Sequence, residues 1–197
     1  MDRVLDSVIA GILSGGGSRR FGSDKAFALW QGKTLLERTI ERASHLTDSI
    51  YILAKDASKY ELLGYPVITD SFPVSTPLNG ILSISPYVEG WLLLLACDIP
   101  FFDVRVLDLL WENRDPSRAA VIHVSGKYQP FLGLYPKSVL RYWEDAFIEG
   151  DYHLQRVIER MPRLVFTEDD LVEQGFLLSS FSNINTVSDL EQVASWT

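Results

Sequence analysis

Short apolar runs alternate with segments of helical periodicity along the N-terminal half of the chain. The first run covers residues 8–13 and ends abruptly in three glycines. A continuous apolar run that stops at turn residues is typical of a strand buried on both faces, as in a parallel sheet. In residues 34–46, apolar side chains then recur at three- and four-residue intervals, which predicts an amphipathic helix.

The same patterns predict further elements along the chain. Strands are expected at 50–54, 66–69, 91–96, 119–124, 129–135 and 163–167. Helices are expected at 57–63, 78–87, 103–113, 138–149, 154–160 and 187–196. The run Trp91–Ala96 is the most apolar segment and is therefore expected to be the central strand. Asp103 suits the N-cap of its helix, and Ser125-Gly126 suits a hairpin turn.

This alternation of strands and helices predicts an α/β fold. The connections are short enough for βαβ units, which place helices on both faces of a mostly parallel sheet. We therefore expect a three-layer sandwich that forms a single domain over residues 1–197. The later hairpin is expected to extend or cover the sheet.

Composition and charge narrow the function. The net charge of −8 argues against nucleic-acid binding, because a phosphate backbone requires a basic face. It leaves room for a small phosphate ligand, which needs only a few local cations. Cys97 is the single cysteine, so no intrachain disulfide can form, and a reducing, cytoplasmic setting is the simplest expectation. We expect no membrane segment and no signal peptide, since no apolar run reaches membrane-spanning length and the first residues lack a basic leader region.

The glycine loop is the strongest candidate for a phosphate site. Gly15, Gly16 and Gly17 follow the first strand, and Arg19, Arg20 and Lys25 come shortly afterwards. Glycine lets the backbone approach a ligand without a Cβ clash, and successive N–H groups can then point at phosphate oxygens. The alternative to a phosphate site is a glycine-rich connection whose charged side chains are simply solvated. The ordered combination of strand, glycines, arginine and Asp-Lys favours the phosphate site.

Two familiar glycine motifs do not match this loop. Gly17 and Gly22 have P-loop spacing, but the residues that follow are Ser23-Asp24-Lys25 instead of Lys and Ser/Thr. A dinucleotide fingerprint fails at its third glycine. The segment L-S-G-G-G-S-R-R-F-G-S-D-K resembles the signature L-A-G-G-x-S-x-R-M-G-x-D-K of the molybdenum cofactor nucleotidyltransferases. That resemblance implies a Rossmann-like fold of the nucleotide-diphospho-sugar transferase type.

Three later segments also resemble this family, in the same order along the chain. Asp98, in A-C-D-I-P-F, occupies the position at which the family holds a metal ion, and helix capping is the alternative role. Asp70 resembles a nucleotide-contacting aspartate, and a turn aspartate is the alternative. Thr76 begins a segment like the family's G-P-L-x-G-I, with threonine in place of glycine.

The last of these segments is N-I-N-T. Asn183 and Asn185 alternate in a segment expected to be extended, so their side chains should point the same way, toward phosphate, metal-bound water or a pterin. The competing interpretation is that these asparagines form a turn and that Thr186 or Ser188 caps the last helix.

The resemblance implies transfer of GMP from GTP to molybdopterin, with release of pyrophosphate. Arg20, Lys25 and Asp98 are the implied catalytic residues, and Asp98 is the implied ligand of Mg²⁺. The implied nucleotide site comprises Leu13, Ser14, Gly15, Gly16, Gly17, Ser18, Lys25, Asp70 and Asp98. Asn183 and Asn185 are the implied acceptor-binding residues, and carriers or acceptor enzymes of the cofactor are expected partners.

Three alternatives remain open at the level of sequence. A cytidylyltransferase for the same pterin would differ only in the base, although relatives that use CTP tend to have L-A-A-G in place of Leu13–Gly16. A sugar-phosphate nucleotidyltransferase would share the fold and the glycine loop. A non-enzymatic nucleotide-binding protein would bind GTP without releasing pyrophosphate.

Overall fold

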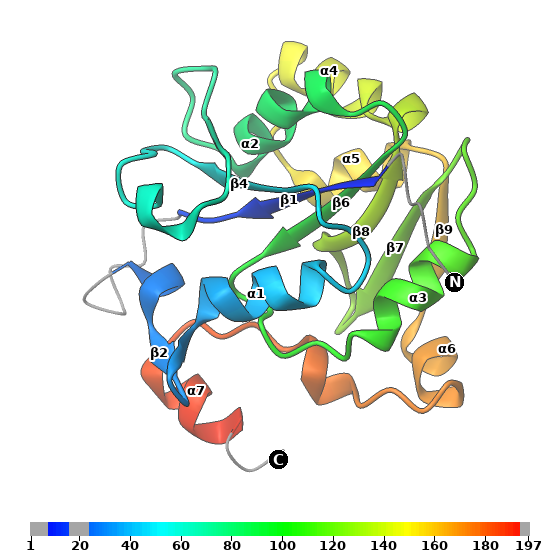
Figure 1. Ribbon diagram of the computed structural model, residues 1–197. Coiled ribbons are helices and arrows are strands. Elements are labelled where there is room, and N and C mark those ends of the chain that lie inside the picture. Colours follow the sequence, from blue (N-terminus) through cyan, green and yellow to red (C-terminus); the bar gives the residue numbers. More distant parts are fainter. Residues whose placement is uncertain (1–7, 16–23, 194–197) are drawn as a thin grey trace.

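The computed structural model describes residues 8–15 and 24–193 and contains one seven-stranded sheet with helices on both sides (Figure 1). The sheet order is β5-β4-β1-β6-β8-β7-β9. Its strands are β1 (Val8–Leu13), β4 (Ile50–Ala54), β5 (Val67–Thr69), β6 (Trp91–Ala96), β7 (Ala119–Val124), β8 (Lys127–Pro136) and β9 (Arg163–Phe166). The small strands β2 (Leu29–Trp30) and β3 (Lys33–Thr34) form a separate hairpin.

The sheet is parallel except for β8. Pairs β1–β4, β1–β6, β4–β5 and β7–β9 are parallel, whereas β8 runs antiparallel to both β6 and β7. Strand β6 stands in the middle of the order and is almost completely buried, as its apolar sequence predicted. The carboxyl ends of β5, β4, β1 and β6 consequently lie side by side at one edge of the sheet.

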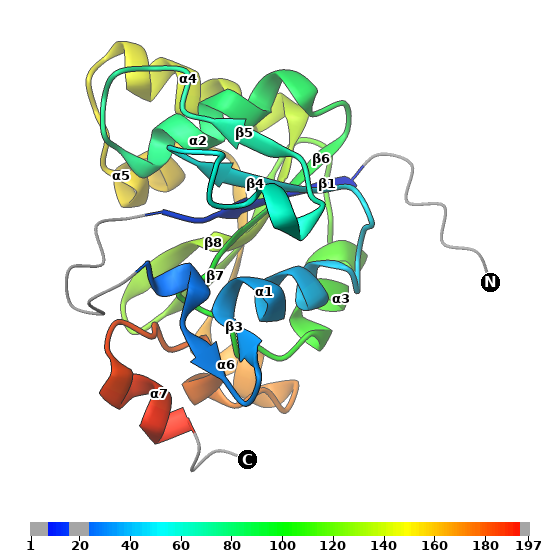
Figure 2. The same cartoon turned by 60° about the vertical axis from the view of Figure 1, so that its left-hand side comes forward.

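Helices cover both faces, which confirms the predicted α/β layering (Figure 2). They are α1 (Leu35–Ala43), α2 (Pro77–Ile84), α3 (Arg105–Glu112), α4 (Arg141–Ile148), α5 (Leu154–Arg160), α6 (Glu168–Glu173) and α7 (Val187–Val193). Side chains of α1, α3 and α6 pack in one core with Ile12 of β1, while α2, α4 and α5 build the core on the opposite face. Helix α7 packs outside both layers, where its Leu190 joins Leu35 and the β2–β3 hairpin.

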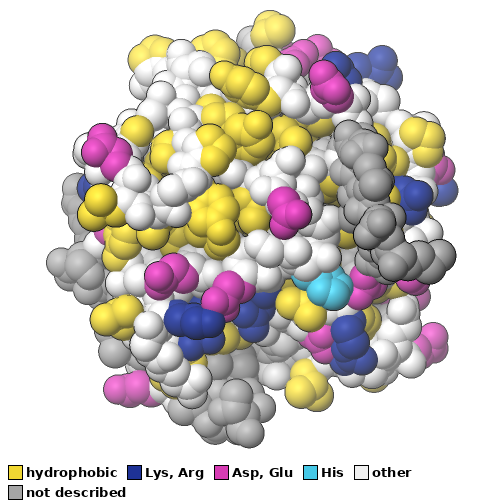
Figure 3. Space-filling view, in the orientation of Figure 1, with side chains coloured by type: hydrophobic (Ala, Val, Ile, Leu, Met, Phe, Trp, Pro, Cys, Tyr) yellow, Lys and Arg dark blue, Asp and Glu magenta, His cyan; other side chains and the backbone are white. Residues whose placement is uncertain are grey.

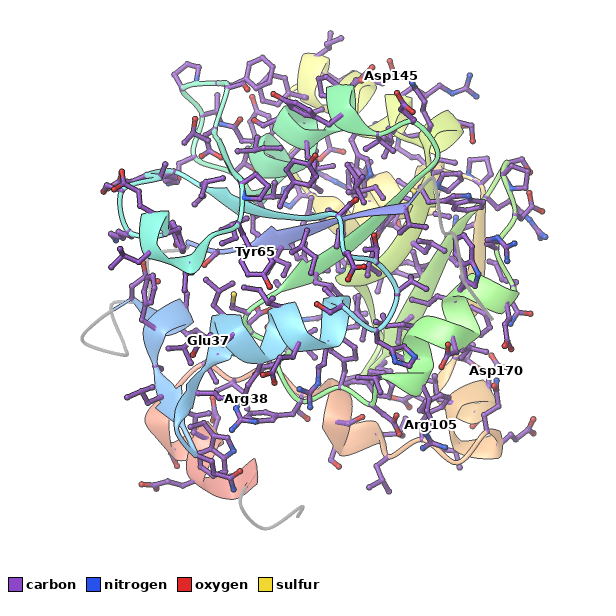
Figure 4. The ribbon with its side chains drawn as sticks, in the orientation of Figure 1. Glu37, Arg38, Tyr65, Arg105, Asp145 and Asp170 are labelled. Atoms are coloured by element: carbon purple, nitrogen blue, oxygen red, sulfur yellow. The ribbon has the colours of Figure 1, made fainter. Side chains whose placement is uncertain are left out.

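Local signals explain where two of these helices begin. Thr34 Oγ1 accepts a hydrogen bond from the Glu37 backbone N–H, and the carboxylate of Glu37, which lies on α1 (Figure 4), accepts one from Thr34 N–H. Together these two bonds form a capping box. Helix α2 begins with Pro77, directly after the cap Thr76, whose hydroxyl accepts from Leu78 N–H. Proline suits this first position because its missing N–H would have no partner within the helix.

Some predicted elements need correction. The segment 57–63 is a turn followed by the short 3-10 helix Glu61–Leu63, and Leu62 is fully exposed. Strand β8 is longer than the predicted 129–135. The hairpin turn at Ser125-Gly126 is confirmed, with φ of 56° and 71°. Asp103 does bond a free N–H, that of Arg105, although the helix itself starts at Arg105.

One face of the surface is mixed in charge. Figure 3 shows hydrophobic side chains gathered on its upper half, where Figure 1 places α2 and α4. Lys and Arg on this face lie beside Asp and Glu and do not form a continuous basic surface. Tethering a phosphate backbone requires such a surface.

Candidate nucleotide and acceptor site

Polar residues follow four neighbouring strands at the carboxyl edge of the sheet. Asp70 follows β5, Lys55 follows β4, Ser14-Gly15 follows β1, and Cys97-Asp98 follows β6. With neighbouring strands about 4.8 Å apart, this row is about 14 Å long. In open α/β sheets, ligands bind at this edge.

All of these residues except the buried Ser14 line a first pocket of about 450 Å³. Its apolar wall includes Leu13, Leu53 and Pro77. The charged groups in it are Asp24, Lys25, Lys55, Asp70 and Asp98. The sequence-predicted residues Leu13, Gly15, Lys25, Asp70 and Asp98 thus lie in one pocket, together with Asn185.

Lys25 and Asp98 are the charged pair at one end of this pocket. Lys25 starts a 3-10 helix (Lys25–Phe27) that Asp24 caps by accepting from Ala26 N–H. Its Nζ donates to Asn185 Oδ1 over 3.4 Å. Burial lowers the pKa of Lys25, and the negative charge of Asp98 partly offsets this effect. An amine in such surroundings lacks much of its water shell, so phosphate oxygens would be strong partners for it.

Asp98 is held by the C-terminal segment. Its backbone carbonyl accepts from Ile184 N–H at 2.7 Å, which leaves the carboxylate at the pocket. Burial raises the pKa of this carboxyl, and the charge of Lys25 opposes the shift. Neighbouring Cys97, the first residue after β6, is buried, and burial raises the pKa of its thiol to about 12. It is therefore not a nucleophile at neutral pH.

Tyr60 is hydrogen-bonded to Ser14, the residue just before the glycines of the loop. The Ser14 hydroxyl donates to the Tyr60 hydroxyl at 3.1 Å, and Tyr60 donates to the Ser14 carbonyl at 3.3 Å. Gly15 has a φ of 120°, a conformation that other residues rarely adopt. The backbone therefore turns sharply at Gly15, just where the strand meets the pocket.

The T-P-L-N-G segment builds the far wall of the first pocket. Asn79 is fully buried, and its amide bonds the backbone of Phe72 and Val74 with three hydrogen bonds of 2.6–3.2 Å. This holds the loop that carries Ser75, which accepts a hydrogen bond from Lys55. Gly80 allows α2 to pack closely on the sheet, since a Cβ there would lie 3.0 Å from Leu13 Cδ1 and 3.4 Å from Leu53 Cβ.

A second pocket of about 480 Å³ adjoins the first, and both include Asp98. It is lined by the residues Asp98, Ile99, Lys127, Tyr128, Gln129, Pro130, Phe131, His153, Leu154, Gln155, Arg156 and Asn183. The two predicted asparagines are therefore separated, with Asn183 in this pocket and Asn185 in the first one. Buried Ile184 stands between them, so the expectation of one shared direction needs this correction.

The capping interpretation of the last motif also proves correct. Thr186 Oγ1 accepts from Asp189 N–H, and Asp189 accepts from the backbone N–H groups of Asn185 and Thr186. Asn185 nevertheless uses its side chain in the pocket. Capping and pocket contact thus occur in the same four-residue segment.

Several predicted residues lie outside the described part of the chain: Gly16, Gly17, Ser18 and Arg20. Sequence reasoning missed Lys55, Tyr60 and most of the second pocket. Lys55 could have been noticed as the first residue after a strand, the position that also identified Asp70 and Asp98. The second pocket was harder, because its residues come from four distant segments.

The donor set of the two pockets fits a magnesium ion bound mainly by its substrate. Within residues 8–15 and 24–193, no three His, Cys, Asp or Glu side chains gather as a metal site. Mg²⁺ commonly takes only one or two carboxylates and completes its shell with phosphate oxygens and water. Asp98 offers such a carboxylate in the first pocket, where the charge of Lys25 favours its anion.

Comparison with known proteins places this geometry in a family. The model of the MobA-like NTP transferase domain matches residues 10–165. The chain belongs to this family. The matched range contains β1, the edge with Lys25 and Asp98, and the β7–β8 hairpin that borders the second pocket.

Relatives whose names state a function are similar to this chain over nearly its whole length. A Halalkalibacterium halodurans protein is 33% identical, covering 94% of this chain and 96% of that protein. An Aquifex aeolicus protein is 29% identical, covering 92% and 88%. Both are named probable molybdenum cofactor guanylyltransferases.

A solved structure shows the same fold. Molybdopterin-guanine dinucleotide biosynthesis protein A from Archaeoglobus fulgidus superposes with a TM-score of 0.79 at 25% identity, covering 95% of this chain and 99% of that one. The MobA-like family members are nucleotidyltransferases, so the chain is an enzyme of this class. None of its described helices is long and apolar enough to span a membrane.

Proposed function

We propose that the protein transfers GMP from GTP to molybdopterin and releases pyrophosphate. The observation that carries this proposal is the pair of adjoining pockets that meet at Asp98. A transferase needs two substrates with their reacting atoms in contact, and a shared residue marks the place where contact is possible. The relatives are named probable molybdenum cofactor guanylyltransferases, and these names support GTP and molybdopterin as the two substrates.

The order of groups along the sheet edge suggests how GTP lies. Its α-phosphate belongs beside Asp98, the point nearest to the second pocket. The base and ribose then extend toward Leu13, Gly15 and Asp70, and the β- and γ-phosphates toward Lys25. Molybdopterin occupies the second pocket, with its phosphate at Asp98 and Asn183 beside it.

The reaction requires alignment and charge neutralisation more than covalent catalysis. An oxygen of the molybdopterin phosphate attacks the α-phosphorus of GTP. The bond between that phosphorus and the α–β bridging oxygen breaks, and pyrophosphate leaves with the electron pair. Lys25 is placed to neutralise charge on the phosphates, and we assign Arg20, Gly16, Gly17 and Ser18 to the same task from the motif alone.

Mg²⁺ fits this proposal as a partner of Asp98. A bound magnesium ion would neutralise phosphate charge and act as a Lewis acid at the α-phosphorus. Asp98 would hold it from the protein side, and Lys25 would remain free to contact the other phosphate oxygens. Asn185 keeps the Lys25 amine pointed into the pocket by accepting its hydrogen bond.

We also propose a cytoplasmic setting, in which carriers or acceptor enzymes of the cofactor exchange pterin and product with this protein. The chain has one cysteine, Cys97, and so cannot contain an intrachain disulfide, which fits a reducing setting.

A pyrophosphate-release assay tests the reaction. Purified protein is incubated with Mg²⁺, molybdopterin and each nucleoside triphosphate in turn. Release with GTP well above CTP, ATP and UTP is expected. A preference for CTP would identify a cytidylyltransferase, and release only with sugar phosphates would identify a sugar-phosphate enzyme. GTP binding without release for any acceptor would mean that the protein is not a transferase.

A further inference from the structure

The wall of the second pocket is an irregular part of β8. The pairing of β6 with β8 ends at Leu95 and Leu132. On its other side, β7 shifts register, because Val121 pairs with Gly133 while the next residue, Ile122, pairs with Gln129. Residues 130–132 therefore have no partner in β7. Lining residues 128–131 thus form the pocket wall beyond the point where pairing with β6 has ended.

Gln155 replaces the missing neighbour strand at one end of this wall. Its Oε1 accepts from Tyr128 N–H at 2.8 Å, and its Nε2 donates to the Tyr128 carbonyl at 2.9 Å. These are the two hydrogen bonds that a paired strand would make with that residue. Gln155 lies on α5, so this helix holds the strand in place.

Tyr135 holds the other end of the wall. Its hydroxyl donates to the Pro130 carbonyl at 2.9 Å, and the residue is fully buried. To reach that carbonyl, the ring folds back along its own strand over Gly133. A Cβ at Gly133 would lie 3.0 Å from Tyr135 Cε2 and from its hydroxyl oxygen. Glycine at this position therefore permits the hydrogen bond.

We propose that Tyr135 and Gln155 are positioning residues for the acceptor substrate. They fix residues 128–131 through hydrogen bonds to the backbone, and this wall then presents Tyr128, Gln129 and Phe131 to the pocket. The inference rests on the proposed function, since it assigns the second pocket to molybdopterin. Tyr135 does not line the pocket, so its effect must act through the wall.

The first pocket contains a matching arrangement that serves as an internal comparison. Tyr60 bonds Ser14 at the start of the glycine loop, as Tyr135 bonds Pro130 in the second pocket. Each tyrosine has a buried ring and hydrogen-bonds a backbone carbonyl in the wall of one pocket. Removal of one hydroxyl should therefore affect one substrate only.

Steady-state kinetics with Tyr135→Phe and Tyr60→Phe test this selectivity. For Tyr135→Phe, the KM for molybdopterin should rise about 5- to 10-fold, as expected for loss of one buried hydrogen bond, with the KM for GTP and kcat within about twofold. Tyr60→Phe should show the opposite pattern. Gln155→Ala should resemble Tyr135→Phe. Thr47→Val removes a buried hydroxyl bonded to the Val8 carbonyl, away from both pockets, and should leave both KM values unchanged.

A second readout does not depend on activity. Hydrogen exchange of segment 127–131 should become faster in Tyr135→Phe and Gln155→Ala, while exchange of segment 50–54 stays unchanged. Equal rises of both KM values, or unchanged exchange of 127–131, would overturn the positioning role. A third outcome separates this inference from the proposed function. If the wild-type protein turns over no molybdopterin but the exchange result holds, the proposed function and the acceptor assignment are wrong. The role of Tyr135 and Gln155 in holding residues 128–131 would still be supported.

Discussion

Asn79→Ala tests whether one buried amide shapes the nucleotide pocket. Asn79 Oδ1 accepts from Phe72 N–H at 3.2 Å, and Nδ2 donates to the carbonyls of Phe72 and Val74 at 2.6 and 3.0 Å. The substitution removes these three hydrogen bonds to the loop, a longer 3.5 Å hydrogen bond within α2, and the amide that fills the space under the loop. Ser75 and Thr76, which line the first pocket, directly follow Val74 in the chain.

The magnitude follows from the number and setting of these bonds. A typical intramolecular hydrogen bond contributes about 1 kcal/mol, so three would contribute about 3 kcal/mol. Phe72 lies in an exposed loop, where water can replace part of the loss. We therefore expect the free energy of unfolding to fall by about 2–3 kcal/mol, and GTP affinity to fall about 3- to 10-fold because the pocket wall is loosened.

Urea denaturation with linear extrapolation measures the first quantity, and calorimetric titration with GTP and Mg²⁺ the second. Asn113→Ala is the matched control, since its amide makes one bond, to the Leu109 carbonyl at an exposed helix end. It should cost less than about 1 kcal/mol and leave GTP binding unchanged. Equal destabilisation by the two variants would refute the reasoning. Destabilisation without any change in GTP affinity would separate the loop from the nucleotide site.

Three other predictions concern the charged groups and the turn. Lys25→Ala should lower kcat at least about 100-fold with unfolding unchanged, as for loss of a group that stabilises developing charge; undiminished turnover would remove Lys25 from the mechanism. Asp98→Ala should abolish Mg²⁺-dependent tightening of GTP binding, measured by titrations with and without the metal; if tightening persists, the metal assignment is wrong. The pH profile of kcat/KM follows from the shifted pKa values. Because the pKa of Asp98 is raised, its anion is lost on acidification already above pH 3.8, and kcat/KM should fall there. Because the pKa of Lys25 is lowered, its positive charge is lost on alkalinisation below pH 10.5, and kcat/KM should fall there as well. Lys25→Arg should move the basic limb upward, and an unmoved limb would assign it to another group.

Much of the fold was predictable because its strands are long apolar runs. The burial of β1 and β6 follows from sequence alone, since almost every residue in them is apolar. The polar helix predicted at 57–63 is wrong because Leu62, one of the few apolar residues of this segment, is fully exposed instead of packing on the core. The β2–β3 hairpin has only two residues per strand, and its turn, Gln31-Gly32, is not one of the common hairpin signals. Helix α6 had a readable signal, the capping box of Thr167 and Asp170, that was overlooked.

The site divides in the same way. Asp70 and Asp98 could be found because residues at the ends of neighbouring parallel strands must meet at one edge. The separation of Asn183 from Asn185 depends on Ile184, whose N–H is fixed by the Asp98 carbonyl far away in sequence. The Gln155–Tyr128 and Tyr135–Pro130 bonds depend on where β6 ends and where β8 bulges. These tertiary contacts produce no periodic pattern in a single sequence, so they could not be predicted from it.

The reversed direction of β8 has a consequence for how such an enzyme can diversify. The residues that follow β5 and β6 lead into α2 and α3, which pack on the faces of the sheet. Because β8 is antiparallel, its start lies at this edge, and the turn at Ser125-Gly126 joins it there to β7. Under the proposed function, changes of length in that turn would alter the second pocket, which the start of β8 borders, while β1, β4 and β6 keep their pairing. The acceptor half of the site would then vary independently of the nucleotide half, which is built on the core strands.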